Sequence, residues 1–217
     1  MKAQLLAIAV SALLCLPVSA KGVFTPKVDL KRCMVGNQAG LLKVLSLQRK
    51  VLFTRGIDDR DQARMDEASR LSLLGALNIE PEQYASVAAI LMRDFNKLPR
   101  KEAVAVLSAI AAAPDFAGRD QVETFLVGVM KTSNDIYARR QAVLGLAVLP
   151  RVKPDTVAAV VARYEVCQNL WETFPVQQFF EYHAAEVKGE SDYAQVRTRL
   201  GAVKSLYTPS VLSYLDS

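Results

Sequence analysis

The chain of 217 residues contains one histidine and three cysteines, so side chains that bind transition metals are scarce. A structural zinc site needs about four cysteine or histidine ligands, and the H-E-x-x-H pattern of zinc proteases is absent. The single histidine, His183, stands among Phe179, Phe180 and Tyr182. We interpret it as a packed side chain, and we expect neither a metal nor an organic cofactor.

The patterns of common catalytic loops are also missing. The sequence has no G-x-S-x-G, no Walker A loop and no dinucleotide-binding glycine fingerprint. Catalysis by carboxylates alone needs only two acidic side chains. Glu190-Ser191 resembles the acid–serine pair of lysozyme-like transglycosylases, yet it stands in a Gly-Glu-Ser-Asp turn, where helix capping by Ser191 or Asp192 explains it better. A cell-wall glycan-active enzyme that uses acidic residues is therefore the alternative function.

The acidic segment 58–67, DDRDQARMDE, lacks the glycine and the ligand spacing of a calcium loop. Its interleaved arginines, Arg60 and Arg64, favour a solvated helix face with ion pairs between successive turns. We therefore expect no cation site there.

Long apolar runs are confined to the N-terminus. Lys2 precedes an apolar run from Leu5 to Leu16, and Val18-Ser19-Ala20 places small residues before Lys21. The run is shorter than the roughly 20 residues that span a bilayer. The pattern predicts a Sec-type signal peptide at 1–20 and a mature chain that is periplasmic or extracellular and not transmembrane.

Basic residues do not gather on one segment. The formal net charge of +5 falls to +4 when Lys2 leaves with the signal peptide, and it is spread along the chain. Proteins that bind nucleic acid usually cluster lysine and arginine on one face. We therefore expect no nucleic-acid partner.

Two cysteines, Cys33 and Cys167, remain after signal cleavage. An oxidising compartment favours a disulfide between them, and its long loop would stabilise the fold by roughly 4–5 kcal/mol. Two unpaired thiols are the alternative.

Alternating strand patterns are absent, and apolar residues recur at helical spacing almost throughout. We predict an irregular arm at 21–36 and one α-helical domain at 37–217. Asn37 caps the first helix, and Pro81, Pro154, Pro175 and Pro209 mark later helix starts.

The helices pair into a repeat. AVLSAIAAAP (105–114) aligns with AVLGLAVLP (142–150) at a spacing of 37 residues. Helical pairs at this spacing are typical of α-solenoids. We predict hairpins at about 58–95, 100–132, 135–168 and 175–206, with helices capping both ends. An irregular helical bundle is the alternative architecture.

One segment resembles a known family. Residues 140–146, Arg-Gln-Ala-Val-Leu-Gly-Leu, resemble the first helix of a HEAT-type repeat, in which an arginine precedes an alanine and a Leu-Gly-Leu run. The resemblance implies an all-α, short right-handed solenoid. We expect Ala142, Val143, Leu144, Leu146 and Ala147 to pack against neighbouring hairpins and Gly145 to permit close helix approach. Arg139 and Arg140, near a helix start, call for an acidic partner, such as Asp135 or an acid on the preceding hairpin.

The predicted function is the binding of a protein or peptide in the cell envelope, without catalysis. In a solenoid the second helices of the hairpins line one face, and arginine and aromatic residues are enriched at binding hot spots. The alternative is that these side chains border the core with polar tips in water. The candidate binding residues are Tyr84, Arg93, Arg119, Gln121, Arg163, Tyr164, Tyr193, Arg197 and Arg199, together with Trp171 in a predicted turn at 170–174.

Overall fold

The computed structural model describes Leu74, residues 79–167 and residues 169–217. Every regular element among these residues is a helix, and they contain no strand, which confirms the all-α prediction. The signal peptide (1–20), the arm (21–36), the predicted helix at 37–52 and the acidic segment 58–67 lie outside the described residues.

Eight α-helices and two short 3-10 helices form the described fold. The 3-10 helices are η2 (Pro81–Gln83) and η3 (Phe95–Lys97). The α-helices are α5 (Tyr84–Arg93), α6 (Arg100–Ala112), α7 (Arg119–Thr132), α8 (Ile136–Ala147), α9 (Pro154–Val166), α10 (Leu170–Gly189), α11 (Tyr193–Ala202) and α12 (Thr208–Asp216).

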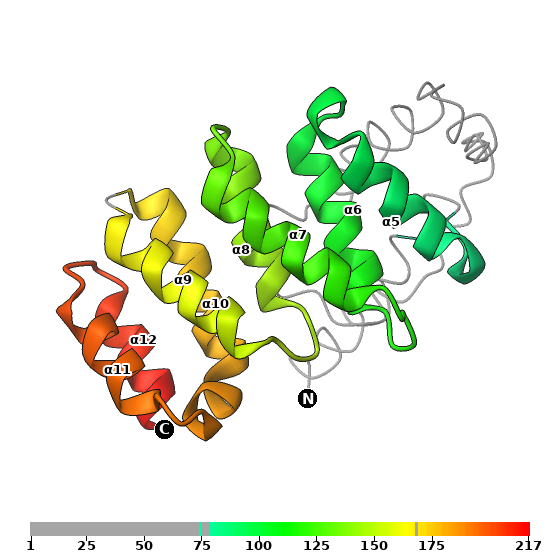
Figure 1. Ribbon diagram of the computed structural model, residues 1–217. Helices are drawn as coiled ribbons and strands as arrows, with labels where there is room; N and C mark the ends of the chain where they lie inside the picture. The colour runs from blue at the N-terminus through cyan, green and yellow to red at the C-terminus, as the bar shows by residue number, and fades with distance from the viewer. Residues whose placement is uncertain (1–73, 75–78, 168) are drawn as a thin grey trace, which may run out of the picture.

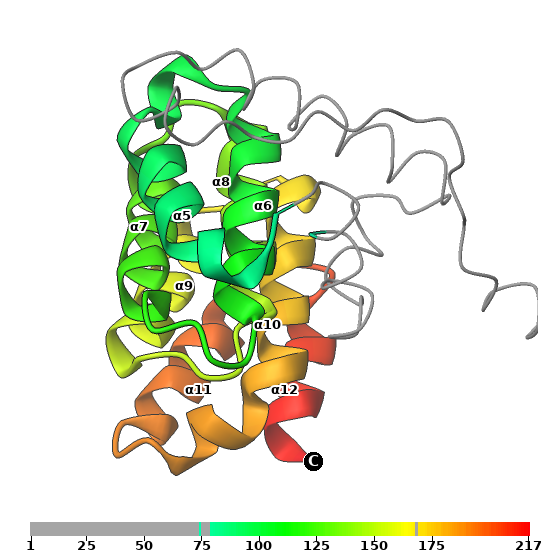
Figure 2. The same cartoon turned by 90° about the vertical axis from the view of Figure 1, so that its right-hand side faces the viewer.

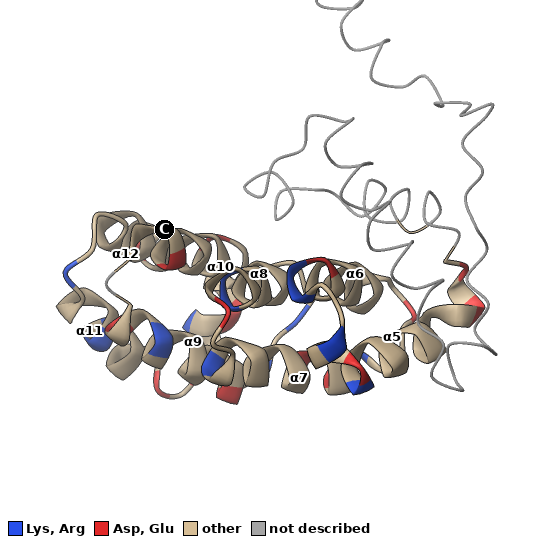
Figure 3. Cartoon of the chain, turned by 90° about the horizontal axis from the view of Figure 1, so that it is seen from above, with Lys and Arg blue, Asp and Glu red and all other residues tan. Residues whose placement is uncertain are grey.

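Successive helices alternate between two layers. Helices α6, α8, α10 and α12 form one layer, which we call the inner layer, and α5, α7, α9 and α11 form the other, the outer layer (Figure 3). Within the first layer α8 packs between α6 and α10, and α10 packs against α12. The chain therefore alternates between the two layers as it advances along the molecule, as Figures 1 and 2 show from two sides. The predicted hairpin 135–168 is not a packed pair, because α8 packs against α6, α7 and α10 rather than against α9.

Local signals account for most helix starts. The Asp135 carboxylate caps α8 by accepting hydrogen bonds from the backbone N–H groups of Tyr137 (2.9 Å) and Ala138 (3.2 Å). Pro154 and Pro209 stand in the first turns of α9 and α12, where a helix needs no donor from them.

The predicted start at Pro175 is wrong. Helix α10 begins five residues earlier, at Leu170, because the Asn169 side chain caps it by accepting from the Trp171 N–H at 2.9 Å. Pro175 is buried inside α10 and removes only the bond that its N–H would donate to the Trp171 carbonyl. Trp171 consequently lies in the first turn of a helix and not in the predicted turn.

Helix α8 lies within the inner layer, between α6 and α10. The predicted packing residues Ala142, Val143, Leu144, Leu146 and Ala147 of α8 are all buried. Gly145 also behaves as predicted: a Cβ at this position would overlap the Ser108 hydroxyl of α6 and stand 3.3 Å from a Leu126 methyl group of α7. The missing side chain thus lets three helices meet.

Two carboxylates hold the connection between α8 and α9. The Glu123 Oε1 atom of α7 accepts from the Lys153 backbone N–H (2.7 Å) and the Thr156 hydroxyl (2.6 Å) at the start of α9. Glu186 of α10 accepts from the Val152 N–H at 3.3 Å. Bonds between hairpins therefore satisfy backbone donors that the helix start leaves open.

His183 is a packed residue, as predicted. Its ring is 3 % exposed, with Nε2 3.1 Å from the Leu146 carbonyl oxygen and Nδ1 3.0 Å from Glu186. It thereby ties α10 to the end of α8.

Candidate binding surface

The connections between the predicted hairpins lie along one edge of the molecule, the upper left of Figure 1. These are the α5–α6, α7–α8, α9–α10 and α11–α12 connections, and we call this the inter-hairpin edge. Among the described residues, five of the six exposed large hydrophobic side chains stand at this edge, the sixth being Tyr182. The five are Tyr137, Val166, Leu170, Trp171 and Leu206. Exposed apolar patches are typical of interaction sites, so this edge is the candidate binding surface.

Trp171 is the largest of these side chains. Its indole is 59 % exposed, and the guanidinium carbon of Arg140 lies 5.3 Å from the ring centroid. Arg140 is itself only 4 % exposed. The indole therefore rests on a buried cation from α8 and leaves much of its surface to solvent.

A cluster of charges fixes the helix turn that carries Trp171. Glu172 Oε1 accepts from Arg139 Nε at 2.7 Å and also from Arg163 Nη2. Arg139 Nη1 donates in addition to the Ser133 carbonyl oxygen at 2.8 Å. The cluster joins the α7–α8 connection, the end of α9 and the start of α10.

The charge balance in this cluster favours the ionised carboxylate. Burial by itself raises the pKa of Glu172, but the hydrogen bonds from Arg139 and Arg163 and the charges of both arginines outweigh burial, so its pKa lies below its ordinary value. The hydrogen bond to Glu172 likewise raises the pKa of Arg139. The expected partner of Arg139 was Asp135 or an acid on the preceding hairpin. The charge of Asp135 acts on Arg139, but the carboxylate that Arg139 hydrogen-bonds is Glu172, on the following predicted hairpin, and the Asp135 side chain caps α8.

A cavity of about 410 Å³ opens beside this cluster. Cys167, Leu170 and Thr173 line one side, and Lys204, Ser205 and Leu206 line the other. Cys167 is a free, buried thiol, and burial raises its pKa. Cys33 lies outside the described residues, so the disulfide between the two stays a prediction.

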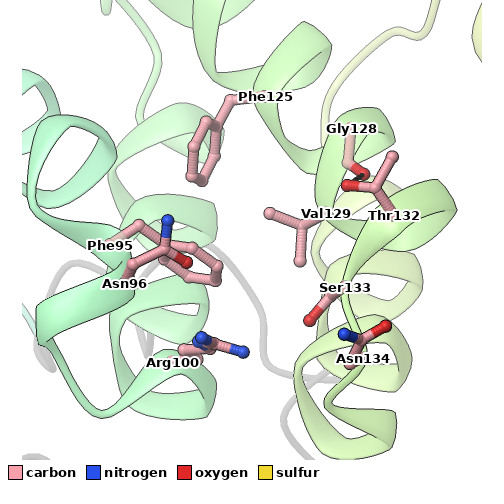
Figure 4. Close-up of a pocket in the computed structure, with 9 residues that line it drawn as sticks. All are labelled: Phe95, Asn96, Arg100, Phe125, Gly128, Val129, Thr132, Ser133 and Asn134. Atoms are coloured by element: carbon pink, nitrogen blue, oxygen red, sulfur yellow. Dashed lines mark hydrogen bonds between the residues drawn. The ribbon is translucent and has the colours of Figure 1, made fainter.

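A second cavity, of about 400 Å³, lies farther along the same edge (Figure 4). Phe95, Asn96 and Arg100 from the α5–α6 region face the end of α7 across it. The remaining lining residues are Phe125, Gly128, Val129, Thr132, Ser133 and Asn134.

Most of the predicted binding residues serve the fold. Arg119 donates to three carbonyl oxygens at the end of α6, those of Ala111 (2.8 Å), Ala113 (2.8 Å) and Pro114 (2.9 Å). Tyr164 is fully buried, with its hydroxyl 3.0 Å from that of Thr208. Tyr164 therefore has no polar tip at the surface, and the half-buried Arg119 uses its guanidinium for bonds within the chain.

The other members of the predicted set are distributed along the outer layer. Tyr84 is buried, and burial together with Glu80 and Glu82 raises its pKa. Gln121 is exposed on α7. The others form bonds within the chain. Arg93 pairs with Asp94 (2.5 Å), and the Tyr193 hydroxyl donates to the Leu215 carbonyl (2.7 Å). Arg197 donates two hydrogen bonds to Asp216 (2.7 and 2.8 Å), and Arg199 donates two to Glu165 (2.8 and 2.7 Å). Of the predicted binding residues, only Arg163, which bonds Glu172, and Trp171, which precedes Glu172, lie at the charge cluster of the inter-hairpin edge.

The sequence did contain a signal for this edge. Asp135-Ile136-Tyr137 and Asn169-Leu170-Trp171 share the order of a capping residue, an aliphatic residue and an aromatic residue, and they are 34 residues apart. Both aromatic side chains fall at the second position of a helix and are exposed. The recurrence of this triplet places equivalent aromatic residues at successive hairpin starts.

The acid–serine pair of the alternative glycan-active enzyme lies in a connection between two helices. Glu190 and Ser191 lie in the connection between α10 and α11, where the Glu190 carbonyl accepts from the Tyr193 N–H at 3.2 Å. Asp192 takes the N-cap position of α11 without a side-chain capping bond. In the part of the chain that the structure describes, no three His, Cys, Asp or Glu side chains are arranged to hold a metal ion.

No protein-family model matches the chain, and no curated protein or solved structure matches it either. None of the helices described above combines the length with the apolar composition that crossing a bilayer requires.

Proposed function

We propose that the chain is an exported, non-enzymatic protein of HEAT-like hairpins that binds a protein or peptide partner in the cell envelope. The binding surface is the inter-hairpin edge. The partner presents apolar groups to Trp171, Leu170, Val166 and Leu206, and to Tyr137 on the neighbouring helix.

Two features support a short solenoid over an irregular bundle. Helix starts recur at similar intervals in the inner layer, since Ile136 follows Arg100 by 36 residues and Leu170 follows Ile136 by 34. Equivalent helices also pack side by side, α6 with α8, α8 with α10 and α10 with α12. Stacked hairpins of this kind produce long surfaces suited to extended partners.

The exposed indole of Trp171 is the observation that carries the proposal. Tryptophan and arginine are the residue types most enriched at binding hot spots. The Asn169 cap, the Arg140 guanidinium and the Glu172 cluster hold this part of α10 in place before any partner arrives. A pre-positioned side chain loses little conformational freedom on binding, which favours affinity.

Capture of envelope proteins on the immobilised chain tests the proposal. Trp171→Ala and Leu206→Ser remove apolar surface from the edge, whereas Tyr182→Ala removes an exposed aromatic side chain elsewhere and serves as the matched control. We expect the wild-type chain and Tyr182→Ala to retain the same partner, and Trp171→Ala to weaken its binding by about tenfold or more.

Circular dichroism establishes that each bait is folded. A folded wild-type chain that captures no specific partner would count against the proposal. Equal capture by the edge variants and the control would show that the partner binds elsewhere than at the inter-hairpin edge.

A further inference from the structure

The cavity between the α5–α6 connection and the end of α7 has an apolar floor. The Phe95 and Phe125 rings pack edge to face, with centroids 5.2 Å apart and planes at 87°. Figure 4 shows Phe95 and Phe125 on one side of the hollow and Gly128, Val129 and Thr132 on the other. The floor therefore suits a large apolar side chain.

Gly128 lines the hollow without a side chain that would project into it. A Cβ built on Gly128 meets no atom within 4 Å, whereas one built on Gly145 would overlap Ser108. A glycine inside a helix costs about 1 kcal/mol relative to alanine. Internal packing explains that cost at Gly145 but not at Gly128, where the open space instead leaves room for a bound group.

The charge of the cavity favours an anion. Arg100 stands at its wall, with its guanidinium carbon 6.0 Å from the Phe95 ring centroid. None of the nine residues lining the cavity carries a carboxylate. The nearby Asp94 side chain is 7 % exposed and pairs with Arg93 and Lys97.

Polar groups complete the rim. Asn96 and Asn134 carry amides, and Ser133 accepts from the Asp135 N–H at 3.2 Å, which leaves its hydroxyl hydrogen for another acceptor. Thr132 already donates to the Gly128 carbonyl at 2.9 Å. The rim thus adds neutral donors around the single positive charge.

We infer that this cavity binds an apolar carboxylate, namely the C-terminal residue of a peptide with a large apolar side chain. The side chain packs between the Phe95 and Phe125 rings on one side and Gly128 on the other, and the carboxylate pairs with Arg100. Arginine is suited to this task because its planar fork donates two parallel hydrogen bonds to one carboxylate. The inference rests on the proposed function, since it specifies which end of a peptide partner the inter-hairpin edge binds.

Titration calorimetry on the purified full chain tests the inference with three probes. The first is an acetylated Ala-Ala-Ala-Phe peptide with a free C-terminal carboxylate, the second is the same peptide as its C-terminal amide, and the third is N-acetylphenylalanine. We expect the free acid to bind at least about tenfold more tightly than the amide, because the amide lacks the charge that pairs with Arg100. N-acetylphenylalanine distinguishes a site for peptide ends from a site for small aromatic acids. A site for small aromatic acids would bind N-acetylphenylalanine as tightly as it binds the peptide.

Variants locate the site. Arg100→Gln removes the charge and Gly128→Leu fills the hollow, and both should weaken binding of the free acid by about tenfold or more. Lys101→Gln removes a neighbouring positive charge from the same helix start without touching the cavity lining, so it should bind as the wild type does. Gly128→Leu projects into open space, and circular dichroism checks that it folds.

Equal binding of acid and amide, or no binding of either to the folded wild-type chain, would overturn the inference. The proposed function fails by a different result, namely loss of specific capture from the envelope fraction. If Trp171→Ala abolishes capture while the peptide probes do not bind, the edge binds its partner without the Arg100 cavity.

Discussion

Gly145 of α8 lies so close to Ser108 of α6 that a methyl group on it would overlap the Ser108 hydroxyl and stand 3.0 Å from the Ser108 Cβ. The Ser108 hydroxyl already donates to the Val104 carbonyl at 2.8 Å. Rotating the hydroxyl away would break that bond and would leave the Cβ contact unchanged. The spacing of two inner-layer helices is therefore set by a glycine facing a serine.

We expect Gly145→Ala to lower the free energy of unfolding by about 1–3 kcal/mol, because overpacking outweighs the helix propensity that alanine adds. Ser108→Gly in the same chain should recover part of the loss, so the two changes should couple in a double-mutant cycle. Urea unfolding measures all four variants. Gly128→Ala is the control, and it should stabilise by up to about 1 kcal/mol since nothing stands near its Cβ. Equal effects of the two glycine substitutions would contradict the close contact.

Glu172 should make stability depend on pH. The pKa of Glu172 in the folded chain lies below its ordinary value of 4.5. Its contribution to the free energy of unfolding is therefore complete above pH 4.5 and is lost as the pH falls through the lower folded pKa. Glu172→Gln should cost about 2–3 kcal/mol at pH 7, and the difference from wild type should shrink below about pH 4.5. Chemical unfolding across this pH range measures both.

Glu165→Gln is the matched control for that experiment. Glu165 also pairs with an arginine, Arg199, and this hydrogen bond lowers its pKa, but both side chains are about one-third exposed. Solvent screens such a pair, so the substitution should cost less than about 1 kcal/mol. A loss at Glu165 as large as that at Glu172 would show that burial of the Glu172 cluster contributes nothing extra.

The predicted disulfide has a direct test. We expect the chain isolated from an oxidising compartment to yield a peptide linking Cys33 to Cys167 under non-reducing digestion, and we expect reduction to lower the thermal midpoint. A Cys33→Ser chain is the control, because it leaves only the buried Cys167 thiol. Recovery of both cysteines as free thiols from the unreduced protein would leave Cys167 as a packed thiol of raised pKa.

Export has an equally direct readout. We expect the protein recovered from the periplasm or the medium to begin at Lys21, as measured by intact mass and N-terminal sequencing. Replacing Ala20 by a large residue, Ala20→Leu, should block cleavage and retain the full-length chain in the membrane fraction, because the −1 site requires a small side chain. A chain found only in the cytoplasm with Met1 in place would refute the signal peptide.

Helix positions could be predicted well where the signal is local. Prolines at 154 and 209 and the carboxylate at 135 act within one turn of the helix that they start. Pro175 misled the prediction because a proline can also stand inside a helix whose start is fixed by another cap, here Asn169.

The candidate site could be predicted only in part. Its residue type makes Trp171 a candidate binding residue, but the role of Arg139 depends on Glu172, which is 33 residues away in the sequence. Arg100, Phe95 and Phe125 carry no motif, and they form a cavity only because the α5–α6 connection folds against the end of α7.

The sequence by itself determined that the described chain is helical, where most helices begin and that the AVLGLAVLP segment is buried. Caps, prolines and apolar periodicity produce these features, and all of them act over a few neighbouring residues. Only the tertiary structure decided which arginines and tyrosines face solvent. Arg119 meets backbone carbonyls, Tyr164 enters the core and Trp171 stays exposed, because a side chain's exposure depends on which distant helices pack against it.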